Sequence, residues 1–250
     1  MNLMEIREEA WDEALDISTR DADRFWKKRE MNRYINRIYR HIARETRCIR
    51  DATTPAVCLI ASAPVDYTTY DPASLDYIWA NDPNNTNLYQ TDVAPYLHTL
   101  HESIIDVDSC EWSLRYYRLT KVSFTKWEDR MHWEWVPGMP TEYALDMERG
   151  KLAVNYRDTE SDTLRLKVRR LPLVPLIQDT DVPEFREDYH DMFKHGVLAQ
   201  MYRKQDAEVY DLNKANDHWG KYLKDVDEIK QAENLLNERL RPNNSLGAFL

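Results

Sequence analysis

The order of its secondary-structure patterns constrains this chain most: helical sequence comes first, strand-like sequence fills the centre, and helical sequence returns at the end. Helices at both ends of a chain can pack together and leave the strands as an insertion. We therefore expect an α+β fold, in which N- and C-terminal helices form a bundle around a central antiparallel β-rich insertion. The expected parts are N-terminal bundle helices over 1–55, the β-rich insertion domain over 56–180, a C-terminal helical hairpin over 181–241 and a flexible tail over 242–250.

Both ends of the chain show helical periodicity. Five apolar residues recur at spacings of four, three, four and seven, which places them on one helix face. They are Met31, Ile35, Ile38, Ile42 and Ile49. We expect this helix to run from about Arg24 to Arg50. Near the other end, Pro183 suits a first helical turn, so a helix is expected from about residue 181, and a second one after Asp206.

The centre of the chain is typical of β structure. A buried strand is expected at Ala56–Ala61, whereas several turn signals in residues 62–110 indicate a loop-rich segment with short strands. Alternation of apolar and polar residues from Trp112 onward predicts further strands. These are expected at Trp112–Phe124, Met131–Val136, Thr141–Asp146, Lys151–Tyr156 and Leu164–Val168.

Charge is distributed unevenly along the chain. The net charge is −10, yet residues 1–50 carry +2, whereas residues 51–180 carry −8 and residues 181–250 carry −4. Five arginines of the first block follow helical spacings on a face of their own, and we name them the arginine ridge: Arg33, Arg37, Arg40, Arg44 and Arg47. A solvated helix face is the default interpretation of such a ridge. Contact with an acidic protein surface comes next, and contact with phosphate last, because the overall charge opposes general nucleic-acid binding.

Several classes of site lack their sequence signature. The five glycines, at 138, 150, 196, 220 and 247, are too far apart to form a loop that cradles phosphate. No serine or cysteine lies in the context of a nucleophile elbow. The sequence therefore predicts no catalytic residue, no cofactor and no enzymatic activity.

His98, His101 and Glu102 form the most metal-like group in the sequence. The two histidines are about one helical turn apart, as zinc ligands on a helix can be, but the order matches neither zinc-protease motif. Solvated histidines are the default interpretation, so we expect no metal.

Two further patterns concern the compartment. No apolar run approaches the roughly 18 residues that a membrane-spanning helix needs, so we expect no membrane contact. Cys48, Cys58 and Cys110 are odd in number and widely spaced, which indicates reduced thiols in a cytosolic setting.

Aromatic residues gather in the expected insertion. The group comprises Tyr116, Tyr117, Trp127, Trp133, Trp135 and Tyr143. Such a group can stack on a sugar, but tryptophan and tyrosine more often fill small β cores and subunit contacts. We expect a core or interface role.

Two stretches of the chain resemble the head-to-tail adaptor (connector) proteins of tailed bacteriophages. The first combines a tryptophan, an acidic residue and an apolar helix that runs into Ile-Ala-Arg, over Phe25–Asn36 and Ile42–Glu45. The second combines a proline, an acidic turn, a Tyr-His pair and two helices, over Val182–His190, Ala199–Tyr202 and Asn216–Trp219. Pro140–Asp146 and Leu164–Pro172 also resemble the β-insert of that family. The resemblance covers about two-thirds of the chain and leaves residues 62–110 unmatched.

The resemblance implies a virion structural protein: a helical bundle with a β insertion, assembled as a ring beneath the portal. The family has no catalytic residues to carry over. The implied partners are the portal protein, tail tube, nozzle or fibre proteins, and further copies in a twelvefold ring, through which genomic DNA passes. The implied location is the neck or tail of the virion, after synthesis in the host cytoplasm.

Two segments are the expected contact sites in such a ring. The arginine ridge is expected to face a protein partner or the lumen. The apolar tip of the tail, Leu246, Phe249 and Leu250, is expected to dock on the portal, because short segments of this kind often fold on binding. The alternative is a β-rich tail or fibre attachment module that contacts glycan or protein. An enzyme using His98 and His101 is a distant third.

Overall fold

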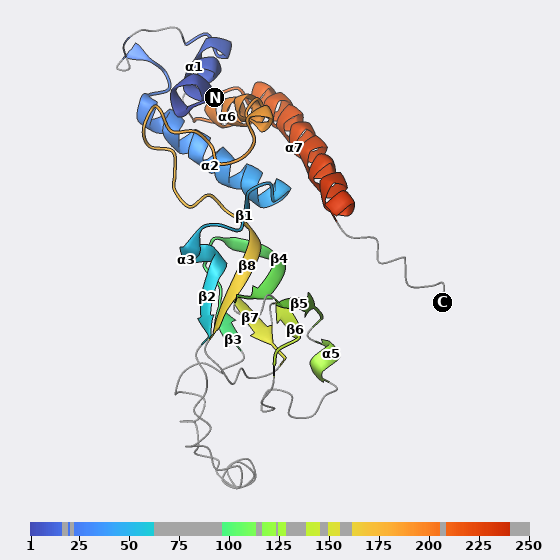
Figure 1. The fold of residues 1–250 in the computed structure, drawn as a ribbon. Helices are drawn as coiled ribbons and strands as arrows, with labels where there is room; N and C mark the ends of the chain where they lie inside the picture. Colours follow the sequence, from blue (N-terminus) through green and yellow to red (C-terminus); the bar gives the residue numbers. More distant parts are fainter. Residues whose placement is uncertain are drawn as a thin grey trace, which may run out of the picture. The chain divides into compact units, whose positions relative to one another are not determined.

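The computed structural model describes residues 1–16, 20, 23–62, 97–113, 117–123, 125–128, 139–145, 150–155, 162–205 and 209–240. The chain divides into two compact units (Figure 1), one made of Met1–Arg50 with Arg170–Leu250, the other of Asp51–Arg169. We name them the helical unit and the strand unit after their main elements.

The helical unit is built around one short central helix. Its elements are α1 (Leu3–Glu13), α2 (Lys28–Thr46), the 3-10 helix η5 (Glu187–Tyr189), α6 (Met192–Tyr202) and α7 (Leu212–Leu240). Helix α6 contacts α1, α2 and α7, which Figure 1 shows gathered around it. Phe193, Val197, Leu198 and Met201 of α6 are completely buried. The core of this unit therefore forms around α6, from segments at both ends of the chain.

Helix α2 carries four residues of the apolar stripe expected from the sequence, and the fifth, Ile49, lies beyond its end. Met31, Ile35, Ile38, Ile42 and Ile49 are all 3% exposed or less. The helix itself is shorter than expected, since it begins at Lys28 and ends at Thr46. Arg47 adopts the left-handed conformation with φ 53°, and its N–H donates to the Ala43 carbonyl at 3.0 Å. This bond ends the helix in the manner of a left-handed C-cap.

Two tryptophans fix the approach to α2. The Trp11 indole N–H donates to the Trp26 carbonyl at 3.0 Å, and the Trp26 indole N–H donates to the Met201 carbonyl at 3.0 Å. The chain before α2 is therefore tied to both α1 and α6.

The helix expected from residue 181 forms later than the sequence indicates, because α6 begins at Met192. The Glu184 N–H donates to the Tyr39 hydroxyl at 2.7 Å, and the Glu184 carboxylate pairs with Arg170 at 2.6 Å. Contacts with residues far away in sequence thus hold the chain out of a helix here, and Pro183 is not in a first helical turn.

The strand unit contains a mixed sheet with short helical turns. Its elements are α3 (Pro55–Cys58), β2 (Leu59–Ser62), β3 (Leu97–Thr99), β4 (Ile104–Trp112), β5 (Tyr117–Lys121), α5 (Thr125–Glu128), β6 (Glu142–Leu145) and β7 (Lys151–Val154). The chain passes between the units within β1 (Arg50–Asp51) and β8 (Asp162–Arg170). The strand order is β1-β8-β4-β5-β6-β7-β3, and β2 also pairs with β8.

The sheet agrees with the sequence in its hairpin and in β8. β6 and β7 pair antiparallel with Tyr143 opposite Val154, as the flanking strands of the Gly150 turn predict. Leu164, Leu166 and Val168 of β8 are buried, which confirms the alternation expected there.

Three strand predictions differ from the structure. β5 and β6 pair in parallel, where only antiparallel pairs were expected. The expected strand Ala56–Ala61 begins as the helical turn α3, because Asp51 accepts hydrogen bonds from the Thr53 and Thr54 N–H groups just before Pro55. The expected strand Trp112–Phe124 is divided between β4 and β5, and β4 begins earlier, at Ile104. Met131–Val136 lies outside the described residues.

Candidate functional site

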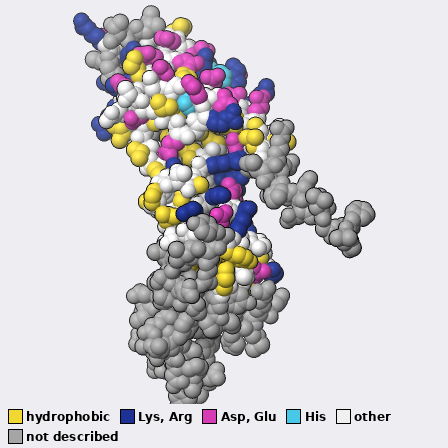
Figure 2. Space-filling view, in the orientation of Figure 1, with side chains coloured by type: hydrophobic (Ala, Val, Ile, Leu, Met, Phe, Trp, Pro, Cys, Tyr) yellow, Lys and Arg dark blue, Asp and Glu magenta, His cyan; other side chains and the backbone are white. Residues whose placement is uncertain are grey.

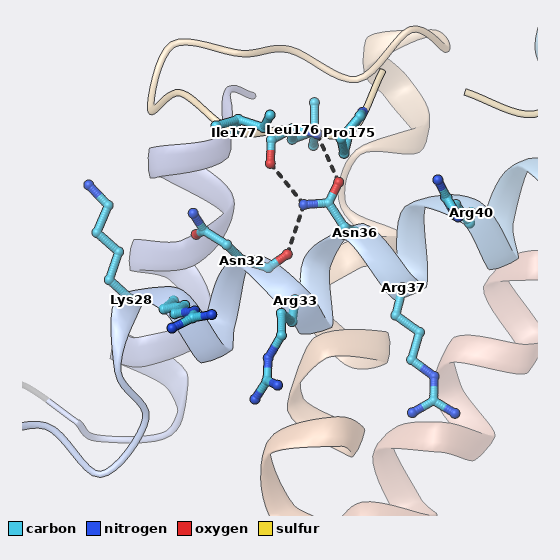
Figure 3. A pocket seen from close by; sticks show the side chains of 10 residues that line it. Lys28, Asn32, Arg33, Asn36, Arg37, Arg40, Pro175, Leu176 and Ile177 are labelled. Atoms are coloured by element: carbon cyan, nitrogen blue, oxygen red, sulfur yellow. Dashed lines mark hydrogen bonds between the residues drawn. The ribbon is translucent and has the colours of Figure 1, made fainter. Parts of the chain in front are cut away.

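A groove with a volume of about 860 Å³ runs along the solvent side of α2 within the helical unit (Figure 3). One side of it consists of α2 side chains and the other of a short stretch of extended chain. We name it the basic groove, and its residues are Lys28, Arg29, Asn32, Arg33, Asn36, Arg37, Arg40, Pro175, Leu176 and Ile177.

Asn36 joins the two sides of the basic groove. Its Oδ1 accepts from the Leu176 N–H at 2.8 Å, and its Nδ2 donates to the Leu176 carbonyl at 2.8 Å and to the Asn32 carbonyl at 2.9 Å. Figure 3 shows Asn36 turned toward this chain segment, while Arg33 and Arg37 extend away from it. Leu176 is buried and Ile177 is 67% exposed, so the segment gives the groove an apolar wall.

The cations of the basic groove are only partly neutralised. Lys28 pairs with Asp179 at 2.7 Å, and Arg37 donates to the neutral Gln200 amide at 3.3 Å. Within the described ranges, no carboxylate forms an ion pair with Arg29, Arg33 or Arg40. Like charges spaced three and four apart on one helix repel by a few tenths of a kcal/mol per pair. The isolated helix therefore gains nothing from this arrangement.

The structure divides the predicted arginine ridge. Arg33, Arg37 and Arg40 line the basic groove, and all three are exposed. Arg44 is exposed on α2 but does not line the groove, and Arg47 lies in the C-cap beyond the helix. The ridge is shorter than expected because α2 ends at Thr46. The left-handed residue that follows is Arg47 and not a glycine, so the sequence does not indicate the end of the helix.

A second groove of the helical unit has a volume of about 580 Å³, and five acidic side chains line it together with Lys194, His195 and four uncharged residues. It lies between α1, the start of α6 and α7, and Figure 2 shows acidic side chains and histidines mixed on the face of this unit that is turned to the viewer. We name it the acidic groove, and its residues are Glu9, Asp188, Tyr189, Asp191, Met192, Lys194, His195, Asp225, Glu228, Ile229 and Ala232. No local sequence pattern indicates this groove, because its residues come from three segments that are far apart in the chain.

Two histidines meet beside the acidic groove. His195 Nδ1 of α6 and His218 Nδ1 of α7 lie 3.2 Å apart, so one nitrogen carries the shared hydrogen and the other accepts it. The Tyr202 ring stacks on His218, with ring centroids 5.7 Å apart. Burial is the largest cause of the lowered pKa of His218, and the neighbouring His195 lowers this pKa further. The neutral form of His218 is therefore favoured in the folded chain.

A buried carboxylate anchors α7. Glu233 is 4% exposed, and its two oxygens accept from Arg50 Nη2 at 2.7 Å and from the Tyr189 hydroxyl at 3.0 Å. Burial and this hydrogen bond raise the pKa of Tyr189 to about 12. Glu233 therefore ties the second half of α7 to Arg50, where the first segment of this unit ends, and to η5.

The histidines singled out in the sequence do not form a metal cluster. Burial lowers the pKa of His98 in β3 to about 4, and His101 Nδ1 lies 2.8 Å from the Ser103 hydroxyl. Among the residues that the structure describes, no three His, Cys, Asp or Glu side chains are placed to hold a metal ion.

The thiols are reduced in the structure. Cys48, Cys58 and Cys110 are all free, and the latter two are buried. Burial raises the pKa of Cys48 to about 11 and that of Cys110 to about 12. Both therefore stay protonated near neutral pH.

The aromatic group is at least partly core. Trp127 is completely buried with its indole N–H bonded to Glu142 at 2.9 Å, and Tyr143 is 1% exposed. A sugar-stacking platform therefore loses two of its expected members. Tyr116, Trp133 and Trp135 lie outside the described residues.

The expected docking tail, with Leu246, Phe249 and Leu250, also lies outside the described residues. The helices that the structure does describe include none that is both long and apolar enough to cross a membrane.

A comparison with protein families gives a match. A sequence model for the family described as SU10 adaptor protein matches residues 1–245, which include the strand unit and all but the last five residues of the helical unit. No curated protein sequence matches the chain.

Proposed function

The chain belongs to the SU10 adaptor protein family, and we propose that it joins the portal of a tailed phage to the tail, as a ring that forms part of the DNA conduit. Membership of this family makes the chain a structural adaptor of the phage virion. The observation that carries the proposal is the extent of the match, over residues 1–245. A match of this length includes the strand unit and the helical unit except for its last five residues, 246–250.

The surface of the helical unit supports a role in protein contact. Both grooves are open and lined by charged side chains, and charge complementarity between proteins gives specificity and speeds association. The basic groove adds an apolar wall at Leu176 and Ile177. This combination of charge and apolar surface suits a protein partner, and we assign no catalytic step to it.

The proposed partners are the portal protein on one side and a tail tube, nozzle or fibre protein on the other. We further propose that the copies form a twelvefold ring on the portal. We propose that Leu246, Phe249 and Leu250 bind the portal surface, and that DNA passes through the ring without being held.

The purified full-length chain mixed with portal rings of the same phage tests this proposal. Native mass spectrometry counts the bound copies, and cryo-EM class averages locate them. The expected result is a ring of copies at one end of the portal. A chain that leaves the portal unbound, yet shows a change in tryptophan fluorescence with glycans, would instead support an attachment module.

A further inference from the structure

We propose that the basic groove of one copy receives the acidic groove of the next copy, so that the two grooves form one contact repeated around the ring. The partner is a second copy of this chain. The inference rests on the proposed assembly into a ring and names the surfaces that meet there.

Charge is the first argument for this contact. The basic groove presents Arg29, Arg33 and Arg40, which form no ion pair with the described residues of their own copy. The acidic groove presents Asp191 and Asp225, which likewise form no ion pair within the described part of the chain. Each groove therefore has charges that a second copy can neutralise, and opposite potentials on two surfaces favour their association.

Apolar surface is the second argument. Ile177, 67% exposed, stands on the wall of the basic groove, and Ile229 and Ala232 line the acidic groove. The buried centre of a protein interface is apolar and poor in charge, with polar groups around it. Each groove offers both parts of such an interface.

Symmetry is the third argument. The basic groove is built from α2 and residues 175–177, whereas the acidic groove is built from α1, the start of α6 and α7. A contact between two different surfaces of one protein is heterologous, and its repetition gives a closed ring when the rotation closes. Both grooves belong to one compact unit in which α6 packs on α2 and α7. The core of this unit therefore fixes the direction of one groove relative to the other, and with it the rotation that relates one copy to the next.

Phosphate is the rival occupant of the basic groove. Binding of a DNA backbone depends on the number of cations, and it gains little from an apolar wall such as Leu176 and Ile177. Asp179 also stands beside Lys28 at one end of the groove, where it would repel phosphate. These features favour a protein occupant.

Two pairs of charge reversals test the contact in the full-length chain. The basic-reversed variant carries Arg33→Glu and Arg37→Glu, and the acid-reversed variant carries Asp225→Lys and Glu228→Lys. A matched control carries Lys27→Glu and Lys214→Glu, two exposed lysines that line neither groove. Circular dichroism and thermal unfolding confirm that each variant folds. Native mass spectrometry counts multi-copy species for the chain alone and on portal rings.

Each reversed variant alone is expected to associate about tenfold or more weakly than the wild type, because like charges then face each other. An equal mixture of the two variants is expected to assemble again in alternating order. In that order every contact pairs either two native grooves or two reversed grooves, so charges are opposite everywhere. The control is expected to assemble as the wild type does.

Several results would overturn the inference. They are unchanged assembly of the reversed variants, a mixture that fails to assemble although both variants fold, a control that loses assembly equally, and a wild-type chain that stays monomeric alone and on the portal. Normal assembly together with loss of DNA binding in the basic-reversed variant would assign the groove to phosphate. Attachment of single copies to the portal is scored separately, so the proposed adaptor role can stand when this inference fails.

Discussion

The side chain of Asn36 holds the backbone of Leu176 through two hydrogen bonds of 2.8 Å, one accepted from the N–H and one donated to the carbonyl. The Asn36 amide thus bonds both backbone groups of Leu176, as a neighbouring β-strand would, although the segment around Leu176 is irregular. It sets the distance between the charged side of the basic groove and its apolar wall. A single helix position therefore shapes the groove.

Replacing Asn36 with Ala should release this wall. The Leu176 N–H and carbonyl would lose their partner, and an unsatisfied, partly buried polar group costs about 1–3 kcal/mol. Urea unfolding measures the loss of stability, and hydrogen exchange at the Leu176 amide should become faster. Asn213→Ala, at an exposed position of α7, serves as the control and should change stability little. Slow exchange at Leu176 in the Asn36→Ala variant would contradict this account.

Gly196 and Gly220 provide a matched pair of glycine-to-alanine changes. A Cβ on Gly196 would lie 2.9 Å from Ile38 and 3.0 Å from Tyr222, whereas a Cβ on Gly220 would meet nothing within 4 Å. Overpacking costs about 1–3 kcal/mol, while alanine gains about 0.5–1 kcal/mol over glycine inside a helix. Gly196→Ala should therefore lower the unfolding temperature, and Gly220→Ala should raise it slightly. Equal shifts in calorimetry would show that α6 packs less tightly than the structure indicates.

Glu233 should matter more for stability than an exposed glutamate of the same helix. Removing one partner of a buried ion pair costs about 3–5 kcal/mol of stability. We expect a cost at the low end of this range for Glu233, because its partner Arg50 is partly exposed to solvent. Glu233→Ala should thus cost about 3 kcal/mol in urea unfolding. Glu228→Ala, which removes an exposed pair with Lys224, should have little effect. If both variants unfold alike, the anchoring role of Glu233 is wrong.

The helical unit should lose stability as the pH falls through the histidine range. The folded chain lowers the pKa of His218, so the unfolded chain binds this proton more tightly. The stability from His218 is fully present above about pH 7 and is lost as the pH falls below about 6.5, toward the folded pKa. His41 and His190 shift in the same direction, so they add to the loss.

Replacing His218 with Gln should reduce this pH dependence without abolishing it. Glu13 and Asp217 oppose the shift of His218, and Lys221 supports it. The pKa values of Glu13 and Asp217 are themselves lowered, so both carboxylates are charged at both pH values of the test. The measurement is the unfolding temperature at pH 7.5 and 5.5 for the wild type and the variant. His101→Gln, whose ring contacts Ser103 in the strand unit, is the control. A wild-type difference that the His218→Gln variant keeps in full would contradict the assignment.

Periodicity predicted the parts of the fold that local sequence decides. The buried stripe of α2 and the alternation in β8 follow from spacings of three to four and of two. The start of α6 was placed too early, because contacts with Tyr39 and Arg170, both far away in sequence, hold Glu184 outside a helix. Tertiary contacts of this kind leave no local pattern.

The candidate site was predictable only in part, for the same reason. Arg33, Arg37 and Arg40 lie on one helix, so their spacing placed them together. The wall at Leu176 and the acidic groove combine segments that only the folded core brings together. Arg47 was grouped wrongly because a left-handed arginine at a helix end has no sequence signature as clear as glycine.

The tail prediction concerns attachment and leaves the fold unchanged. Leu246, Phe249 and Leu250 are apolar residues in a segment without helical or strand periodicity, and we propose that they bind the portal. Deleting residues 243–250 should therefore leave the circular dichroism spectrum and the unfolding temperature of the chain unchanged, while portal binding is lost.

A full-length variant with Leu246→Ser, Phe249→Ser and Leu250→Ser should behave like the deletion, because it removes the apolar contacts and keeps the length. Asn243→Ser with Asn244→Ser changes the same segment without touching its apolar residues and should bind the portal normally. If the deleted chain still attaches in full copy number, portal docking must come from other surfaces, and the two grooves of the helical unit are the next surfaces to change.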